Sequence, residues 1–177
     1  MQDKKPLILV VDDNPQNVQF LGNLLIAREY ELGIAENGVK ALEFVEARLP
    51  DLILLDIMMP EMDGFECCMK LKENHEYSHI PIIFLTAKNE TEDIVKGFEV
   101  GAVDYVTKPF VGAELLARVK THLEIDYLRS ILPICATCKK IRDEEGYLSR
   151  VEEYFLKFTK TRFSHGICED CLKKYHH

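Results

Sequence analysis

The sequence predicts an α/β fold in which a doubly wound sheet of five parallel strands precedes a small C-terminal α+β module. Three observations carry this prediction: apolar runs alternate with helical patterns, polar residues follow the apolar runs, and the composition changes after residue 127. Short apolar strands separated by helices indicate a parallel sheet covered on both faces, because an alternating pattern would leave one face wet.

Each predicted strand is a short run that separates two helical patterns. LILVV, LILL and IIFL form the first, third and fourth strands and are apolar throughout, whereas YELGIA and DYVTK form the second and fifth. The strands are predicted at residues 7–11, 30–35, 52–55, 82–85 and 104–108.

A helical pattern follows each strand. Gly64, directly after Asp63, predicts the turn that opens the third helix. In the last helix, Leu and Val recur at near-helical spacing as far as Leu128, so we expect it to run on toward residue 132 and to offer a surface for a second copy. The helices are predicted at residues 15–29, 38–47, 64–73, 91–100 and 112–130.

Length and composition favour one full domain with a small appendage. The chain has 177 residues, of which 47% are hydrophobic and 29% charged, as in ordinary soluble domains. We expect the domain at residues 1–127, a helical linker at 128–134 and the module at 135–177. The N-terminus lacks a signal-peptide core and no apolar run approaches the ~20 residues of a membrane span, so we expect a cytoplasmic protein.

Polar residues lie where the predicted strands end. Asp12 and Asp13 end the first strand, Asp56 the third, Thr86 the fourth and Lys108 the fifth. In doubly wound sheets these ends meet at one edge, where ligands bind. Clustered carboxylates repel one another unless a cation neutralises them, and oxygen ligands suit Mg²⁺. Asp56 is therefore a candidate metal ligand, nucleophile or both, against the simpler reading of a solvated loop charge.

Four motifs in this order resemble the receiver domain of bacterial response regulators, a flavodoxin-like fold. They are VVDDN at 10–14, LLDIMMPEMDG at 54–64, LTA at 85–87 and the Lys-Pro of VTKPF at 106–110, and the resemblance covers roughly residues 5–127. It implies transfer of a phosphoryl group from a histidine kinase, or from a phosphotransfer protein, onto Asp56. Such a domain is a signalling phosphoacceptor and not an enzyme with a separate substrate.

The resemblance also implies the metal and phosphoryl contacts. Mg²⁺ would be held by Asp13, Asp56, the main-chain carbonyl of Met58 and, through water, Asp12. Lys108 would pair with the phosphoryl oxygens. In phosphoryl transfer the protein supplies mainly positioning and positive charge, which this set provides.

The resemblance places a conformational switch at Thr86 and Tyr105. Tyr105 lies three residues before Lys108, as does the receiver aromatic that moves between outward and inward positions, although a plain strand aromatic fits β-propensity as well. The small Ala87 leaves room beside the phosphate, and Lys108-Pro109 is a candidate cis peptide. The signalling surface, and the surface of a homodimer, is expected on the fourth helix, fifth strand, fifth helix and linker.

Two C-x-x-C pairs in the last fifty residues predict a tetrahedral thiolate site for structural Zn²⁺. The ligands are Cys135, Cys138, Cys168 and Cys171. A segment this short buries too little apolar surface to fold alone, so a zinc-ribbon-like staple is expected. Iron ranks second, because rubredoxins have a glycine after each pair where this chain has Lys139 and Leu172. Disulfides or free thiols are the remaining alternatives.

The tail carries no signature of an enzymatic output. Residues 131–177 hold nine Lys and Arg against seven Asp and Glu, and four zinc-bound thiolates would cancel this excess, so we expect an unidentified downstream protein rather than nucleic acid. The alternatives are a redox or metal sensor, a DNA-binding output, and a haloacid-dehalogenase-type phosphatase. The last would need a second Asp two residues after Asp56, where this chain has Met58.

Overall fold

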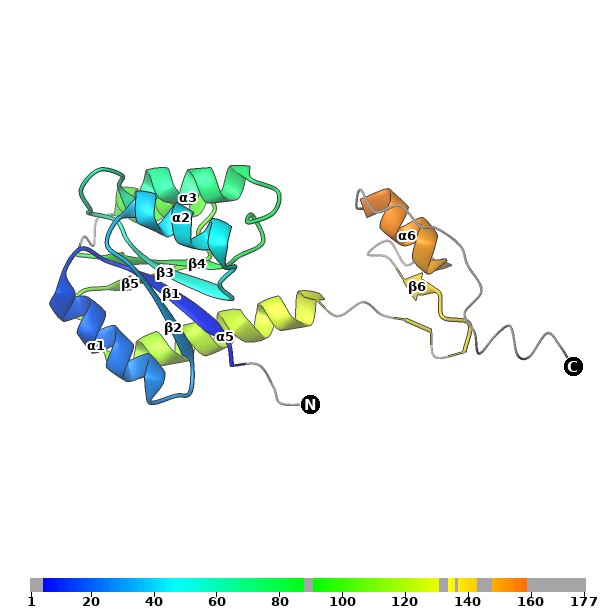
Figure 1. Ribbon diagram of the computed structural model, residues 1–177, viewed down its shortest axis with the longest axis horizontal. Coiled ribbons are helices and arrows are strands. Elements are labelled where there is room, and N and C mark those ends of the chain that lie inside the picture. Colours follow the sequence, from blue (N-terminus) through cyan, green and yellow to red (C-terminus); the bar gives the residue numbers. More distant parts are fainter. Residues whose placement is uncertain (1–4, 88–90, 131–133, 136, 143–147, 159–177) are drawn as a thin grey trace, which may run out of the picture. The chain divides into compact units, whose positions relative to one another are not determined.

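The computed structural model describes residues 5–87, 91–130, 134–135, 137–142 and 148–158. The chain forms two compact units, Met1–Leu128 and Arg129–His177. The first unit contains a five-stranded sheet in the order β2-β1-β3-β4-β5, with every neighbouring pair parallel (Figure 1). The predicted doubly wound parallel fold is therefore confirmed for this unit.

The helices and strands of the first unit lie where the sequence predicts them, with small shifts at their ends. The strands are β1 (Leu7–Val11), β2 (Glu31–Ala35), β3 (Leu52–Asp56), β4 (Ile82–Thr86) and β5 (Asp104–Thr107). The helices are α1 (Pro15–Ile26), α2 (Gly38–Ala47), α3 (Gly64–Glu73), α4 (Thr91–Glu99) and α5 (Gly112–Ser130).

Two hydrophobic cores lie on opposite faces of the sheet. Helices α1 and α5 cover one face and α2 and α3 the other (Figure 1). Successive side chains of a strand point to opposite faces, so Leu9 joins the core with α2 and α3, and Ile8 and Val10 join the core with α1 and α5. All five residues of β1, β3 and β4 are buried, as the apolar runs predict.

Helix starts are fixed by side-chain caps. Asn14, Asn37 and Asp63 each accept a hydrogen bond from a main-chain N–H in the first turn of α1, α2 and α3. Asp63 thus confirms that Gly64 opens the third helix. The first helix is shorter than predicted, because the chain turns after Ile26 through Glu29, whose φ is 64°.

The second unit contains a short antiparallel hairpin and a helix. Strands β6 (Ile141–Arg142) and β7 (Leu148–Ser149) pair with each other, and α6 (Val151–Phe158) follows. Of the predicted helical linker at 128–134, residues 128–130 belong to α5 and 131–133 lie outside the described residues. Ile134 forms an antiparallel bridge with Ile141 and is not helical. Within the described segments, no helix combines the length and the apolar character that a membrane span requires.

Candidate functional site

The ends of β1, β3, β4 and β5 bring together the polar residues that the sequence singles out. Asp56 ends the central strand β3, Asp12 follows β1, and Lys108 follows β5. Carboxylate oxygens of Asp12, Asp13 and Asp56 all lie within 4.8 Å of one another. The predicted convergence at one edge of the sheet is what the structure shows.

Lys108 bridges two of these carboxylates. Its Nζ donates to Asp12 Oδ2 at 2.8 Å and to Asp56 Oδ2 at 2.6 Å. The side chains of Asp12 and Asp56 are only 0% and 7% exposed, so both ion pairs are sheltered from water. The Lys108 main-chain N–H donates to Thr86 O at 2.7 Å, and the Lys108–Pro109 peptide is cis, as predicted. These contacts fix the lysine over the carboxylates.

Asp12 is oriented by neighbours that the sequence analysis did not single out. Asn17 Nδ2 lies 3.0 Å and 2.9 Å from the two carboxylate oxygens of Asp12, and the Asn14 main-chain N–H donates to Oδ1 at 2.9 Å. Asn17 belongs to the first turn of α1, directly after the strand-end aspartates. This position in the sequence could have identified Asn17 as a residue of the acidic pocket.

Asp56 is held by the loop that leads into α3. The main-chain N–H of Met58 lies 3.4 Å from Asp56 Oδ1, and the N–H of Gly64 donates to Ile57 O at 2.9 Å. A Cβ at position 64 would overlap the main-chain oxygen of Asp56. The loop can therefore close this tightly over Asp56 only with glycine at its end.

Burial and charge act in opposite directions on the two central groups. Burial raises the pKa of Asp56, helped by the charge of Asp12 and opposed by Lys108. Burial lowers the pKa of Lys108, but the hydrogen bonds and charges of Asp12 and Asp56 outweigh it and leave that pKa raised. Lys108 is therefore a permanent cation beside the carboxylates.

The donor set of this acidic pocket fits a divalent cation. Three carboxylates face the single ammonium group of Lys108, which leaves an excess of negative charge in a largely buried place. All three donors are hard oxygens, the ligands that Mg²⁺ prefers, and Asp13 is exposed enough for a metal to keep bound water. The sequence-based expectation of Mg²⁺ agrees with this geometry.

The predicted switch residues lie on neighbouring strands. Thr86 is buried at the end of β4, and Ala87 is exposed just beyond it. Tyr105 of β5 is half-buried against the core that contains Phe84. The ring of Phe98 in α4 meets it edge to face, with centroids 6.1 Å apart. Tyr105 is thus placed between the sheet and α4.

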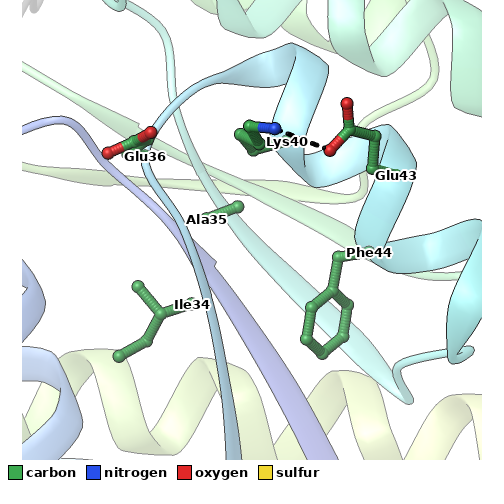
Figure 2. Close-up of a pocket in the computed structure, with 6 residues that line it drawn as sticks. All are labelled: Ile34, Ala35, Glu36, Lys40, Glu43 and Phe44. Atoms are coloured by element: carbon green, nitrogen blue, oxygen red, sulfur yellow. Dashed lines mark hydrogen bonds and ion pairs between the residues drawn. The ribbon is translucent and has the colours of Figure 1, made fainter.

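Two cavities flank this part of the domain. One, of about 240 Å³, opens beside Lys108 and is lined by Asn17, Phe20, Lys108, Pro109 and Phe110. The other, of about 420 Å³, lies between β2 and α2 (Figure 2). None of the predicted site residues lines the second cavity, and its Lys40 is already paired with Glu43 at 2.9 Å. Of these two cavities, the first lies beside Lys108 of the acidic pocket.

The described part of the second unit includes half of the predicted cysteine site. Cys135 and Cys138 lie in a tight turn, and the main-chain N–H of Cys138 points at Cys135 Sγ over 3.5 Å. Cys168 and Cys171 lie outside the described residues. The structure therefore describes the first C-x-x-C pair alone, and the four-cysteine metal site stays a prediction.

Comparison with known proteins points to one family. A family model described as the response regulator receiver domain matches residues 8–120. A probable cyclic di-GMP phosphodiesterase of Vibrio cholerae is 47% identical over 125 residues, 71% of this chain, and the response regulator PleD of Caulobacter vibrioides is 46% identical over 126 residues, 69% of this chain. This chain spans 28% of the length of each.

Solved structures agree with the sequence matches. The crystal structure of a response regulator from Chloroflexus aurantiacus superposes with a TM-score of 0.67 at 35% identity, and it covers 68% of this chain and 99% of the other. The residues that the family model matches, 8–120, all lie in the first unit. The flavodoxin-like fold of the first unit is therefore shared with response regulators of solved structure.

Proposed function

Because the chain belongs to the response regulator receiver family, we propose that Asp56 accepts a phosphoryl group from a histidine kinase or a phosphotransfer protein. The observation that carries this proposal is the position of Lys108. Its Nζ bridges Asp12 and Asp56 at the end of the central strand. Transfer of phosphoryl label from a phosphorylated kinase to the wild-type chain, and its absence from an Asp56→Asn variant, tests the proposal.

The chemistry follows from the positions of the side chains. An Asp56 carboxylate oxygen attacks the phosphorus atom of the donor phosphohistidine; an O–P bond forms as the P–N bond breaks, and the imidazole leaves with the electron pair and takes up a proton. Lys108 Nζ, released from one of its carboxylates, pairs with a phosphoryl oxygen and offsets the charge there.

Asp12, Asp13, Asp56 and the Met58 carbonyl are the proposed Mg²⁺ ligands, with Asp12 acting through water. Mg²⁺ supplies positive charge to the phosphoryl oxygens when bound. The carboxylate cluster within 4.8 Å supports the assignment, as does the turn that brings Met58 next to Asp56. Asn17 and the Asn14 N–H keep Asp12 in the orientation that such a site needs.

Thr86 and Tyr105 are the proposed readout. A phosphoryl group on Asp56 attracts the Thr86 hydroxyl, and the space that Thr86 leaves admits the Tyr105 ring further into the domain. The edge-to-face contact between Phe98 and Tyr105 supports this coupling, because movement of Tyr105 then changes the surface of α4.

Replacement of Lys108 by alanine should separate phosphorylation from the switch. We expect Lys108→Ala to keep part of the labelling by acetyl phosphate, because Asp56 and the metal ligands remain, but to lose the response of Tyr105 to the phosphoryl group. Intrinsic tyrosine fluorescence or NMR shifts of α4 and β5, recorded with and without acetyl phosphate, measure this response. A Lys5→Ala variant is the control, since Lys5 lies away from the pocket in an exposed ion pair with Glu29. A full switching response in Lys108→Ala would contradict the assignment.

The cavity beside Lys108 is a proposed contact for the phosphodonor protein. Phe20 of α1 is 45% exposed and stacks on Phe110 with ring centroids 6.2 Å apart, which places an apolar surface next to the acidic pocket. Exposed aromatic side chains of this kind are common anchors at protein interfaces.

A negative charge on this surface should slow phosphoryl transfer from a protein donor but not from a small-molecule donor. We expect Phe20→Asp to slow phosphoryl transfer from the cognate kinase by about tenfold or more, the effect of losing one interface anchor. Labelling by acetyl phosphate should stay at the wild-type rate, because the Asp56 carboxylate is held by Lys108 and the Met58 N–H and not by Phe20. Ile26→Asp, another exposed apolar residue of α1, is the matched control. Equal slowing with both donors would refute the docking role.

We propose that the phosphorylated domain signals by binding another protein through α4, β5 and α5. A second copy of this chain is one candidate partner, which would give a homodimer. Val95 and Phe98 of α4 and Leu128 of α5 are exposed apolar residues that support this surface. A DNA-binding output and a redox or metal sensor remain the alternatives for the second unit. The phosphodiesterase activity belongs to the name of the Vibrio relative. For this chain we propose a cytoplasmic phosphoacceptor that catalyses no reaction beyond its own phosphorylation and dephosphorylation.

A further inference from the structure

Strand β2 forms one edge of the sheet and pairs on one side with β1. The Glu31 N–H donates to the residue before β1 at 2.9 Å, and Ala35 O accepts from the residue after β1 at 3.2 Å, so both face that strand. Leu32 and Ile34 alternate with them and therefore direct their main-chain N–H and C=O groups to the open edge. An edge of this kind is a template for a further strand.

The opposite edge strand, β5, is guarded by side chains of its own unit. The Tyr105 N–H donates to Asp104 Oδ1 at 2.8 Å, and an arginine and a histidine of α5 hold the same carboxylate. Charged side chains at an edge protect it against pairing with another strand. On β2 the ion pair between Arg48 and Glu31 lies at the first residue of the strand, and Ile34 near the other end is 52% exposed.

The cavity of about 420 Å³ between β2 and α2 reaches this open edge (Figure 2). Phe44 lies over the face of β2 that carries Gly33, where an added Cβ would overlap the ring. Ile34 points to the opposite face, because successive side chains of a strand alternate, and Figure 2 shows the two side chains on opposite sides of the β2 ribbon. A cavity that both Phe44 and Ile34 line therefore extends around the edge of the strand.

The rim of this cavity is acidic. Glu36 and Glu43 line it together with one cation, Lys40, whose Nζ lies 2.9 Å from Glu43 Oε2. The pKa of Lys40 is raised, first by the hydrogen bond and the charge of Glu43 and then by the charges of Glu36 and Glu61. A second copy of the chain would bring the same carboxylates against this rim, whereas a basic partner would offset their charge.

We propose that the open edge of β2 binds an extended peptide, in which basic and apolar residues alternate, as an added strand of the sheet. Its main chain pairs with Leu32 and Ile34. On one face of the added strand, a basic side chain lays its methylene stem on Phe44 and its charged end near Glu43. On the other face, an apolar side chain packs against Ile34. This interaction goes beyond the phosphoacceptor function and does not depend on it.

Peptide binding and amide hydrogen exchange of the full chain test this proposal. The probe is a capped synthetic peptide of alternating lysine and valine, and the control peptide has glutamate in place of each lysine. The lysine peptide should bind at least about tenfold more tightly than the glutamate peptide, because only the first offsets the acidic rim. Its binding should slow the exchange of the Leu32 and Ile34 amides by about tenfold or more, while the Tyr105 amide of the other edge strand keeps its rate.

Two pairs of variants separate the edge from the rim. Ile34→Pro removes one edge N–H without removing a bond to β1, and should bind the lysine peptide about tenfold more weakly. The matched Ile34→Val keeps the N–H and should bind as the wild type does. Glu43→Gln should weaken binding by about threefold, the effect of one exposed ion pair. Glu46→Gln, on the same helix but not in the lining of the cavity, should leave binding unchanged.

Equal affinity for the two peptides, or unchanged exchange of Leu32 and Ile34 with the lysine peptide bound, would overturn strand addition. If exchange of these amides slows with rising protein concentration in the absence of peptide, the edge belongs to a second copy of the chain, and the peptide partner is refuted. The exchange experiment needs the wild-type protein alone, so it decides between these outcomes even if Ile34→Pro fails to fold.

Discussion

Replacing Asp56 with asparagine is expected to abolish phosphoryl labelling while leaving the fold intact. The amide has nearly the shape of the carboxylate, but it lacks the anionic oxygen that attacks phosphorus and it is a weaker ligand for a hard cation. Asp56 is the carboxylate that ends the central strand and pairs with Lys108 at 2.6 Å. Its loss therefore removes the nucleophile and one proposed metal ligand together.

Labelling by acetyl phosphate and by a phosphorylated kinase, with hydroxylamine cleavage to identify an acyl phosphate, measures this effect. Asp63→Asn is the matched control. Asp63 lies in the same loop and caps α3, and asparagine is an equally good cap, so this variant removes one nearby carboxylate without removing the proposed nucleophile. Hydroxylamine-labile label on Asp56→Asn at wild-type stoichiometry would refute the assignment.

The same variant should be at least as stable as the wild type in the absence of metal. The pKa of Asp56 is raised in the folded protein, chiefly by burial, so ionisation of this group costs folding free energy once the pH rises above its unfolded pKa. Asparagine stays neutral and removes that cost. The free energy of unfolding at neutral pH, measured in urea with EDTA present, should therefore not fall, and an unfolded variant would make the loss of label uninformative.

The first unit was predictable because its apolar runs and its strand-end polar residues encode the same topology. The run LILVV followed by Asp12 and Asp13 fixes both a buried strand and the chemistry at its end. The end of α1 was not predictable by periodicity, because the helical pattern continues past Ile26 while the chain turns through a left-handed Glu29. Local backbone geometry of this kind has no apolar signature.

The sequence predicted which residues form the acidic pocket, but not how their side chains contact one another. Sequence position places Asp12, Asp56 and Lys108 at one edge of the sheet, but it does not say that Lys108 bridges both carboxylates or that Asn17 orients Asp12. Those contacts depend on side-chain conformations that only packing decides.

Substituting Gly64 by alanine is expected to destabilise the first unit and slow phosphorylation. An added Cβ would overlap the main-chain oxygen of Asp56 and lie 2.9 Å from the Cα of Ile57. Both neighbours are backbone atoms, which cannot rotate away as a side chain can, so the loop between β3 and α3 must shift. Overpacking of this kind costs about 1–3 kcal/mol. The shift also moves Asp56 relative to Lys108, so the rate of labelling should fall with stability.

Urea unfolding and labelling rates of Gly64→Ala and Gly97→Ala, measured in parallel, decide whether position 64 is special. Gly97 lies within α4, where a Cβ would meet the Phe84 ring at 3.2 Å, a side chain with some freedom to move. Alanine is the better helix former by about 1 kcal/mol, which offsets that contact, so Gly97→Ala should stay close to the wild type in both measurements. Gly64→Ala should show a lower urea midpoint with an unchanged m-value. If the two variants unfold at the same urea concentration and label at the same rate, the loop tolerates a side chain at position 64, and the close approach of Gly64 to Asp56 does not position the phosphoacceptor.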